Sequence, residues 1–183
     1  MEQTDIFYNQ PQQKSFFSNL GSHIIDLIQS LVVFGAIFAM IYLFVAQPHK
    51  VSGNSMYPYL HNGDYILTDK LSYKMGGPQR GEIIVFKNPR DDSQDFVKRI
   101  IGLPGEKLKI EGGKVYINGK TLPEDYLPDQ THTKIGAFMG EGQEITIPQG
   151  YFFVIGDNRD HSSDAREWGP VSFEKFIGKA FVR

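Results

Sequence analysis

Hydrophobic residues are spread unevenly along this 183-residue chain. The segment from Leu31 to Ala46 has no charged side chain, and it extends back to Ile24 with Asp26 as its one charge. At about 1.5 Å per residue, a helix over residues 24–46 is long enough to cross a hydrocarbon core of about 30 Å. The pattern therefore predicts one N-terminal transmembrane helix at 24–46, preceded by a polar segment at 1–23.

Two other interpretations of this apolar segment are a buried core helix and a cleavable signal peptide. A core helix of a soluble protein normally keeps a polar face, whereas residues 31–46 are apolar on every side. A signal peptide starts near the N-terminus with a basic region and ends in small residues, and neither feature is present here. A retained anchor is favoured. The few Lys and Arg residues nearby do not indicate its orientation.

From residue 47 to 183, short apolar runs alternate with turn residues, which is typical of a β-rich domain. Gly112-Gly113 separates two such runs and predicts a hairpin, and Asn118-Gly119 predicts a second tight turn. The polar segment 123–143 predicts a loop, so we expect a small inserted subdomain at about 105–145. The main apolar runs lie at 65–68, 83–86, 96–101, 151–155 and 176–182.

Composition and charge exclude several classes of protein. Lys and Arg together number 19 and Asp and Glu 21, giving a net charge of -2, so the basic excess typical of a nucleic-acid partner is missing. The chain has no cysteine, which excludes disulfide scaffolds, thiolate metal sites and cysteine nucleophiles.

Two short segments carry candidate chemistry. In S-G-N-S-M-Y-P, Gly53 and Pro58 indicate a tight turn that presents the hydroxyl of Ser55, although such clusters are usually plain loops. In F-V-K-R-I-I-G-L-P-G, strand alternation places Lys98 in an apolar row. Burial there would lower the pKa of its amine and allow it to act as a general base. The alternative is that Lys98 and Arg99 both extend into solvent.

A third segment, G-D-N-R-D-H-S-S-D-A-R at residues 156–166, follows the apolar run 151–155. Its interleaved Asp and Arg residues predict a hydrogen-bonded network on a loop held by a rigid strand. A solvated polar turn is an alternative. A metal site is another, but the arginines would neutralise the carboxylate ligands.

Together these motifs, with G-E-I-I-V-F at residues 81–86, resemble those of bacterial type I signal peptidases in order and approximate spacing. The resemblance runs from the anchor to the C-terminus. It implies a mainly β fold, in which a signal-peptidase-like β catalytic domain with a small inserted β subdomain follows one transmembrane helix. It also implies a Ser–Lys dyad serine protease that removes signal peptides from exported preproteins.

The resemblance also assigns site residues, by their positions in the matched motifs. The resemblance implies Ser55 as nucleophile and Lys98 as general base, with Ser162 orienting the lysine amine. Asp164 and Arg166 match a pair that holds the loop against the dyad, and Asp157 and Asn158 match positions that shape the site. The oxyanion region comprises Ser55 and Gly53. Some relatives have a serine hydroxyl at the position of Gly53. In this chain the donors to the oxyanion are therefore main-chain groups alone, or main-chain groups with Asn54 or Ser52. The expected substrate cleft includes Met56 and the strand Ile83, Ile84, Val85 and Phe86, which is expected to pair with the extended substrate.

The resemblance implies no cofactor and no metal. The expected partners are preprotein signal peptides, the lipid bilayer and the secretion translocon, with no nucleic acid. We expect a single-pass protein of the plasma membrane whose catalytic domain, residues 47–183, lies on the extracytoplasmic face. The absence of cysteine, the short insertion and Gly53 resemble members from Gram-positive bacteria.

Three alternatives stay open. The same fold and dyad serve self-cleaving repressors, but this chain has a transmembrane helix and no DNA-binding region. A catalytically silent homologue acting as a membrane-tethered assembly factor would be expected to have lost Ser55 or Lys98, and both are present. An anchored binding module would not explain the motif at 156–166.

Overall fold

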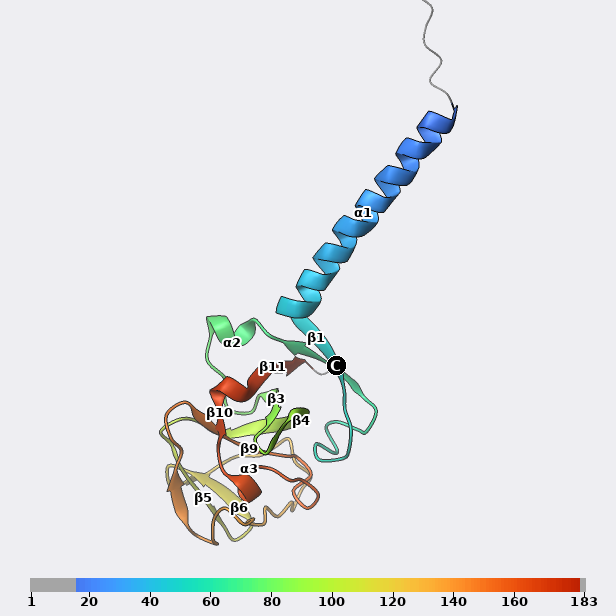
Figure 1. Cartoon of the computed structure of the whole chain (residues 1–183). Coiled ribbons are helices and arrows are strands. Elements are labelled where there is room, and N and C mark those ends of the chain that lie inside the picture. The colour runs from blue at the N-terminus through green and yellow to red at the C-terminus, as the bar shows by residue number, and fades with distance from the viewer. Residues whose placement is uncertain (1–15, 182–183) are drawn as a thin grey trace, which may run out of the picture. The chain divides into compact units, whose positions relative to one another are not determined.

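The structure, a computed structural model, describes residues 16–181. The chain separates into a helical unit that ends at Ile41 and a larger unit that begins at Tyr42. Helix α1 runs from Phe16 to Phe44 (Figure 1). Residues 1–15 of the segment predicted to be polar, and residue 182 of the last apolar run, lie outside the described residues.

Helix α1 contains an apolar span, His23–Tyr42, that is long enough to cross a membrane, and no part of its most apolar window is buried in the structure. An exposed helix that is apolar on all sides is stable in lipid rather than in water. The helix begins at Phe16, before the predicted start at residue 24, and ends at Phe44, two residues before the predicted end.

The larger unit is mainly β, with two antiparallel sheets, as predicted. The seven-stranded sheet has the order β1-β2-β11-β3-β4-β9-β10. Its strands are β1 Ala46–Lys50, β2 Tyr65–Asp69, β3 Ile83–Asn88, β4 Asp91–Gly102, β9 Tyr151–Ile155, β10 Val171–Ser172 and β11 Phe176–Phe181. The remaining helical segments are single turns: α2 Ser72–Met75, α3 Ala165–Trp168 and the 3₁₀ turn η1 Phe173–Lys175.

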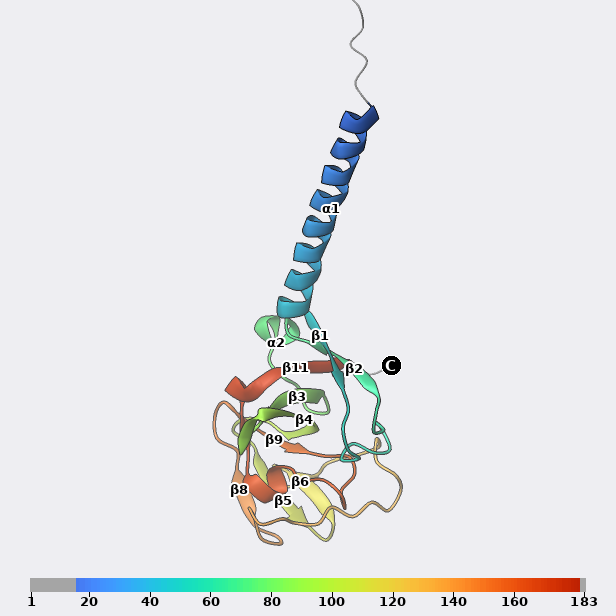
Figure 2. The same cartoon turned by 45° about the vertical axis from the view of Figure 1, so that its right-hand side comes forward.

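A four-stranded sheet of order β7-β6-β5-β8 occupies the region where the insertion was expected. Its strands are β5 Lys107–Glu111, β6 Lys114–Ile117, β7 Lys120–Thr121 and β8 Glu144–Thr146. Both predicted turns are confirmed: Gly112-Gly113 and Asn118-Gly119 have positive φ angles and join β5 to β6 and β6 to β7. Figures 1 and 2 show this sheet at the end of the domain away from β1 and β2.

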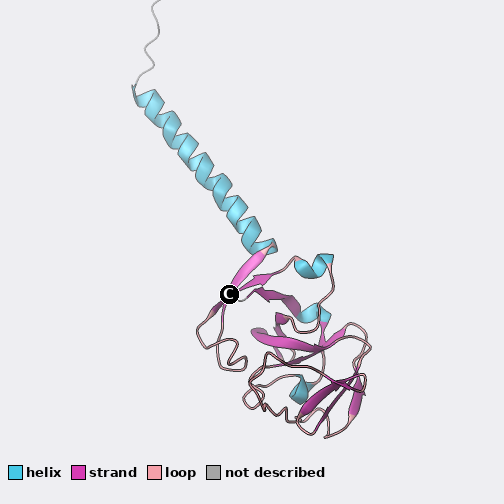
Figure 3. Ribbon diagram, turned by 180° about the vertical axis from the view of Figure 1, so that it is seen from behind, coloured by secondary structure: helices cyan, strands magenta, loops and turns pink. Residues whose placement is uncertain are grey.

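Strand β3 lies at the centre of the packing because its side chains alternate between two cores. Ile84 and Phe86 point into the larger cluster, which also includes residues of the small sheet. Ile83 and Val85 point into a smaller cluster with Met56 of the β1–β2 loop. Figure 3 shows the strands and the short helical segments of this unit from behind. The smaller cluster therefore supports the loop that carries Ser55.

Candidate active site

The β1–β2 loop that carries Ser55 is folded tightly on itself. Its ends are joined by hydrogen bonds from Val51 N to Asp64 O (2.8 Å) and from Gly63 N to Val51 O (2.9 Å). Met56 and Leu60 are buried in the smaller cluster beneath it. Because the residue directly after Ser55 is fixed in the core, Ser55 is held in one position at the surface of the sheet.

Lys98 meets this loop from strand β4. Its side chain is 4% exposed, and Lys98 Nζ lies 2.8 Å from Ser55 Oγ and 2.9 Å from the Val97 carbonyl oxygen. Burial lowers the pKa of the Lys98 amine to about 8, against the opposing influence of Asp164 and Asp157. The alternative that Lys98 and Arg99 extend into solvent is wrong, because both are buried.

Asn158 also fixes the loop that carries Ser55. Asn158 N donates to Ser55 O and Asn158 Nδ2 donates to Asn54 O, each at 3.0 Å. Two consecutive carbonyl groups of the Ser55 loop are thus held by one residue of the segment 156–166. The structure brings this predicted site residue directly against the nucleophile.

Asp157 does not touch the dyad but forms a buried ion pair with Arg99. Arg99 Nε donates to Asp157 Oδ1 at 2.9 Å and its Nη2 donates to Oδ2 at 2.6 Å. The guanidinium also lies over the rings of Tyr126 and Tyr59, at 4.1 and 5.0 Å from their centroids. This bidentate ion pair holds the loop after β9 against the strand that carries Lys98. The sequence pattern did not identify Arg99 as the partner of Asp157.

Asp164 and Arg166 form a second buried pair that closes the loop on itself. Arg166 Nε and Nη2 donate to the two carboxylate oxygens of Asp164 at 2.8 and 2.9 Å. Asp164 also accepts from Gly156 N at 3.0 Å, and Arg166 Nη1 donates to the Arg159 carbonyl oxygen at 2.9 Å. The two ends of the segment 156–166 are therefore held together.

Arg159 links the same loop to the inserted region. It is buried and forms an ion pair with Glu124 and a hydrogen bond with Thr133. Glu124 was not singled out from the sequence, since nothing in its local pattern distinguishes it from a solvated loop residue. The ion pairs of Arg99, Arg159 and Arg166, together with the exposed pair of Asp160 and Lys134, account for the charged Asp and Arg side chains of the motif. No cluster of three metal-ligating side chains occurs among the described residues.

Ser162 lies beside the dyad, yet its hydroxyl is buried without a hydrogen-bond partner in the described structure. A Cβ placed on Gly156 would come within 2.2 Å of Ser162 Oγ and 2.4 Å of Ser55 O. Gly156 thus allows these three residues to pack together. The expected hydrogen bond from Ser162 to the lysine amine is not formed.

The oxyanion region is only partly as expected. Gly53 has a φ of +91°, and its amide donates to Asn62 Oδ1 at 2.9 Å. That amide is therefore already engaged and is not available to an oxyanion. The main-chain amide of Ser55 stays the predicted donor.

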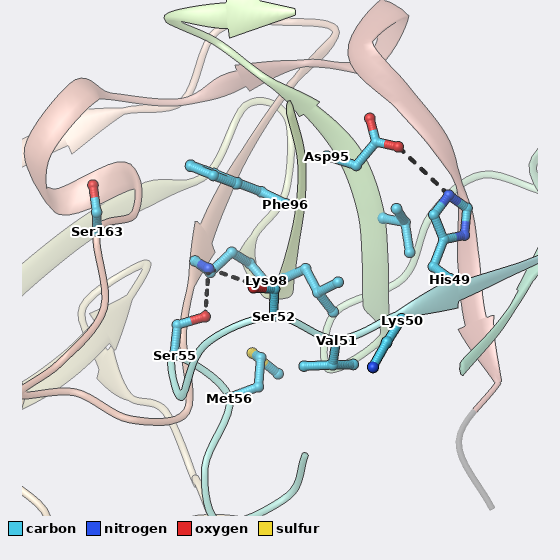
Figure 4. Close-up of a pocket in the computed structure, with 12 residues that line it drawn as sticks. His49, Lys50, Val51, Ser52, Ser55, Met56, Asp95, Phe96, Lys98 and Ser163 are labelled. Carbon is cyan, nitrogen blue, oxygen red and sulfur yellow. Dashed lines mark hydrogen bonds and ion pairs between the residues drawn. The ribbon is translucent and has the colours of Figure 1, made fainter. Parts of the chain in front are cut away.

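A cleft of about 220 Å³ opens beside the dyad, between the end of β1, the Ser55 loop and β4 (Figure 4). Met56 and Val85 line it, as predicted. Ile83, Ile84 and Phe86 do not line it: Ile84 and Phe86 point into the larger cluster on the other face of β3, and Ile83 packs in the smaller cluster without reaching the cleft. Sequence reasoning missed most of its wall, including His49, Val51, Asp95, Phe96 and Val97.

The expectation that the strand 83–86 pairs with substrate is wrong. Strand β3 is bonded to β11 on one side and to β4 on the other, so neither edge is open. Strand β4 pairs with β9 only from Arg99 onward. Among the described residues, the edge of β4 at 95–98 has no partner strand on that side, and it borders the cleft.

Comparison with known proteins adds an independent finding. The family described as "Signal peptidase, peptidase S26" matches residues 24–183. "Probable signal peptidase I-2" of Synechocystis sp. is 40% identical over 76% of this chain and 63% of its own length. "Signal peptidase IB" of Staphylococcus aureus (strain COL) is 32% identical over 90% of this chain and 91% of its own length. A crystal structure of a signal peptidase I from Enterococcus faecalis, 34% identical, aligns with a TM-score of 0.45 over 56% of this chain and 95% of that chain.

Proposed function

The chain belongs to the signal peptidase family, peptidase S26, and we propose that it is a membrane-anchored serine endopeptidase that removes signal peptides from preproteins. Ser55 is the nucleophile and Lys98 the general base. The observation that carries this proposal is the 2.8 Å contact between Lys98 Nζ and Ser55 Oγ, with the lysine buried and its pKa lowered to about 8. The same contact disfavours the alternative of a catalytically silent homologue, because such a protein would not be expected to keep the dyad.

The chemistry needs a lysine that is neutral when it acts. The unprotonated amine of Lys98 accepts the Ser55 hydroxyl proton while Oγ attacks the scissile carbonyl carbon. The tetrahedral oxyanion collapses, the peptide C–N bond breaks, and the Lys98 ammonium gives its proton to the leaving amine. Lys98 then accepts a proton from water, the hydroxide displaces Oγ from the ester, and the proton returns to Ser55. The products are the mature protein and a signal peptide with a free carboxylate.

Substrate binding is proposed at the cleft between β1 and β4. An extended peptide can form main-chain hydrogen bonds with the open edge of β4 while its alternate side chains enter the cleft. The apolar lining by Val51, Val85 and Val97 suits small side chains beside the scissile bond. This arrangement replaces the expected pairing with β3.

Location follows from the proposed substrate. Preproteins emerge on the extracytoplasmic face, so the domain that begins at Tyr42 lies there and α1 crosses the plasma membrane once. The lipid bilayer is then a constant partner, and the secretion translocon is a proposed one. The cysteine-free composition, the short insertion and Gly53 support an origin in a Gram-positive bacterium.

The test is cleavage of a preprotein by the full-length protein in detergent micelles, with the product N-terminus identified by mass spectrometry. We expect a single cut after a small residue that follows the apolar part of the signal peptide. A matched substrate with tryptophan in place of that small residue should resist cleavage. Intact preprotein, or cleavage of both substrates at scattered sites, would contradict the proposal.

A further inference from the structure

Two side chains of the inserted region, Glu124 and Tyr126, contact arginines of the candidate site. Arg159 Nη1 donates to Glu124 Oε2 at 3.1 Å, and the side chains of Arg159 and Glu124 are only 1% and 13% exposed. The ring of Tyr126 lies beside Arg99, whose guanidinium carbon is 4.1 Å from the ring centroid. The polar segment 123–143 therefore contributes a carboxylate and an aromatic ring to this site.

The two contacts belong to one hydrogen-bonded group. Tyr126 OH donates to Glu124 Oε1 at 2.6 Å, and the guanidinium of Arg159 forms an ion pair with the same oxygen. A buried charge is strongly unfavourable without a partner of opposite charge. Glu124 supplies that partner and so fixes the orientation of Arg159. Because Tyr126 is bonded to Glu124, the ring that lies beside Arg99 is fixed with it.

The two arginines hold neighbouring residues of the loop after β9. Arg159 Nε donates to Gly156 O at 3.3 Å, and Arg99 donates to both carboxylate oxygens of Asp157, at 2.9 and 2.6 Å. The main-chain oxygen of one residue and the carboxylate of the next are thus held by separate side chains. A change in the orientation of either arginine would displace this part of the loop.

This part of the loop is in direct contact with the nucleophile. Asn158 N donates to Ser55 O at 3.0 Å, and a Cβ on Gly156 would lie 2.4 Å from the same oxygen. A displacement of residues 156–158 would therefore move Ser55. Its Oγ must stay within hydrogen-bond reach of Lys98 Nζ for proton transfer.

Resting on the signal peptidase function proposed above, we propose that Glu124 and Tyr126 are positioning residues of the dyad. Acting through their two arginines, they hold the segment 156–158 against the loop that carries the nucleophile. Other residues line the cleft beside the dyad, so these two act on the placement of the reacting groups and not on substrate binding.

The test measures kcat and KM of the full-length protein on one preprotein in detergent micelles, at a temperature at which circular dichroism shows every variant to be folded. Glu124→Gln keeps the size of the side chain but removes its charge. We expect kcat to fall about tenfold at an unchanged KM, because misplaced reacting groups slow the chemical step without altering the cleft. Tyr126→Leu, which removes the ring from Arg99, should have the same effect. Tyr126→Phe keeps the ring and loses one hydrogen bond, so its kcat should stay within about threefold of the wild type.

Glu106→Gln is the matched control within the same inserted region. Glu106 forms an ion pair with Arg80 and accepts from Leu103 N at 2.8 Å, and its side chain is 17% exposed. The substitution therefore weakens a comparable half-buried pair whose printed partners all lie outside the segment 156–166. It should leave both kcat and KM unchanged.

Three outcomes would overturn the inference: wild-type kcat in both Glu124→Gln and Tyr126→Leu, a loss that lies wholly in KM, and an equal loss of kcat in Glu106→Gln. If Glu124→Gln does not fold, the two substitutions of Tyr126 decide, and Tyr126→Leu must be slower than Tyr126→Phe. The wild type separates the two proposals. Its failure to cleave the preprotein contradicts the proposed function, whereas normal cleavage by the wild type and by the variants contradicts only the role of Glu124 and Tyr126.

Discussion

At the residue scale, the site depends on a lysine that is placed where its charge is unfavourable. Lys98 is buried among apolar neighbours. Neither Asp157 nor Asp164 forms an ion pair with it, because these carboxylates are paired with Arg99 and Arg166. Asp164 and Asp157 raise the pKa of the Lys98 amine, but burial lowers it by more. The arginine pairs therefore leave Lys98 free to lose its proton near neutral pH.

This environment predicts the pH dependence of cleavage. Only the neutral amine accepts the Ser55 proton, and the pKa of Lys98 is about 8, so kcat/KM should rise with pH up to about 8 and level off above it. Below that point the rise should be about tenfold per pH unit, since the neutral fraction changes by that factor. The measurement is kcat/KM on one preprotein from pH 6 to pH 9. A flat profile would exclude Lys98 as the base whose protonation limits the rate.

The same burial predicts a gain in stability when the lysine is removed. Below pH 8 the folded protein must hold the ammonium away from water, whereas the unfolded chain does not; this penalty is lost as pH rises from about 8 to 10.5. Lys98→Met should therefore raise the free energy of unfolding at pH 7 by about 2 kcal/mol, after allowing about 1 kcal/mol for lost hydrogen bonds. Urea unfolding of both proteins at pH 7 and pH 10 measures it. A less stable variant at pH 7, or an equal difference at both pH values, would contradict the argument.

At the element scale, three segments that are remote in sequence must meet for the dyad to form. The Ser55 loop is fixed by the core beneath Met56 and by Asn158, and β4 is tied to the segment 156–166 through Arg99 and Asp157. Gly156 lies where the loop after β9 passes closest to both Ser55 and Ser162. A small displacement of this loop would move the nucleophile relative to Lys98.

Gly156→Ala tests this close packing. The added methyl group would lie 2.2 Å from Ser162 Oγ and 2.4 Å from Ser55 O, so the loop must shift and we expect kcat/KM to fall by about 100-fold. Gly77→Ala is the matched control, because its Cβ would meet nothing within 4 Å, and it should cleave as the wild type does. Full activity of the Gly156 variant would show that the contact between the loops does not position Ser55.

The elements that sequence patterns predicted are those with apolar runs. The five runs correspond to β2, β3, the second half of β4, β9 and β11, and the glycine turns of the small sheet are also confirmed. Strand β1 was missed because it is polar and contains Pro48, which an edge strand tolerates. The exposed start of β4, Asp91 to Asp95, was missed because it is polar as well. Both missed segments border or line the cleft, so the cleft wall could not be predicted.

At the scale of the whole molecule, the motifs predicted which residues form the site but not how they pair. Arg99 and Asp157 are 58 positions apart and Arg159 and Glu124 are 35 apart, and such pairings depend on strand order rather than on local pattern. The sequence did indicate an apolar helix followed by a β-rich domain. The β-rich domain follows a helix that is long and apolar enough to cross a membrane, and its first strand, β1, begins two residues after the helix ends.

The topology can be tested cleanly because the chain has no cysteine. Single-cysteine variants Asp129→Cys, in the domain, and Gln12→Cys, before the helix, should label oppositely with a membrane-impermeant maleimide. In intact cells the first should react and the second only after permeabilisation. The reverse pattern would place the domain in the cytoplasm and would contradict the proposed access to exported preproteins.

The central claim is that Ser55 acts as nucleophile with neutral Lys98 as its base. The most direct measurement is cleavage of one preprotein by equal amounts of full-length wild type, Ser55→Ala, Lys98→Ala and Lys98→Arg in detergent. We expect cleavage only by the wild type, while all four proteins keep the β-rich circular dichroism spectrum. Lys98→Arg is the sharpest of the variants because its guanidinium stays protonated and cannot accept the serine proton. Cleavage at the wild-type rate by any of the three variants would contradict the account.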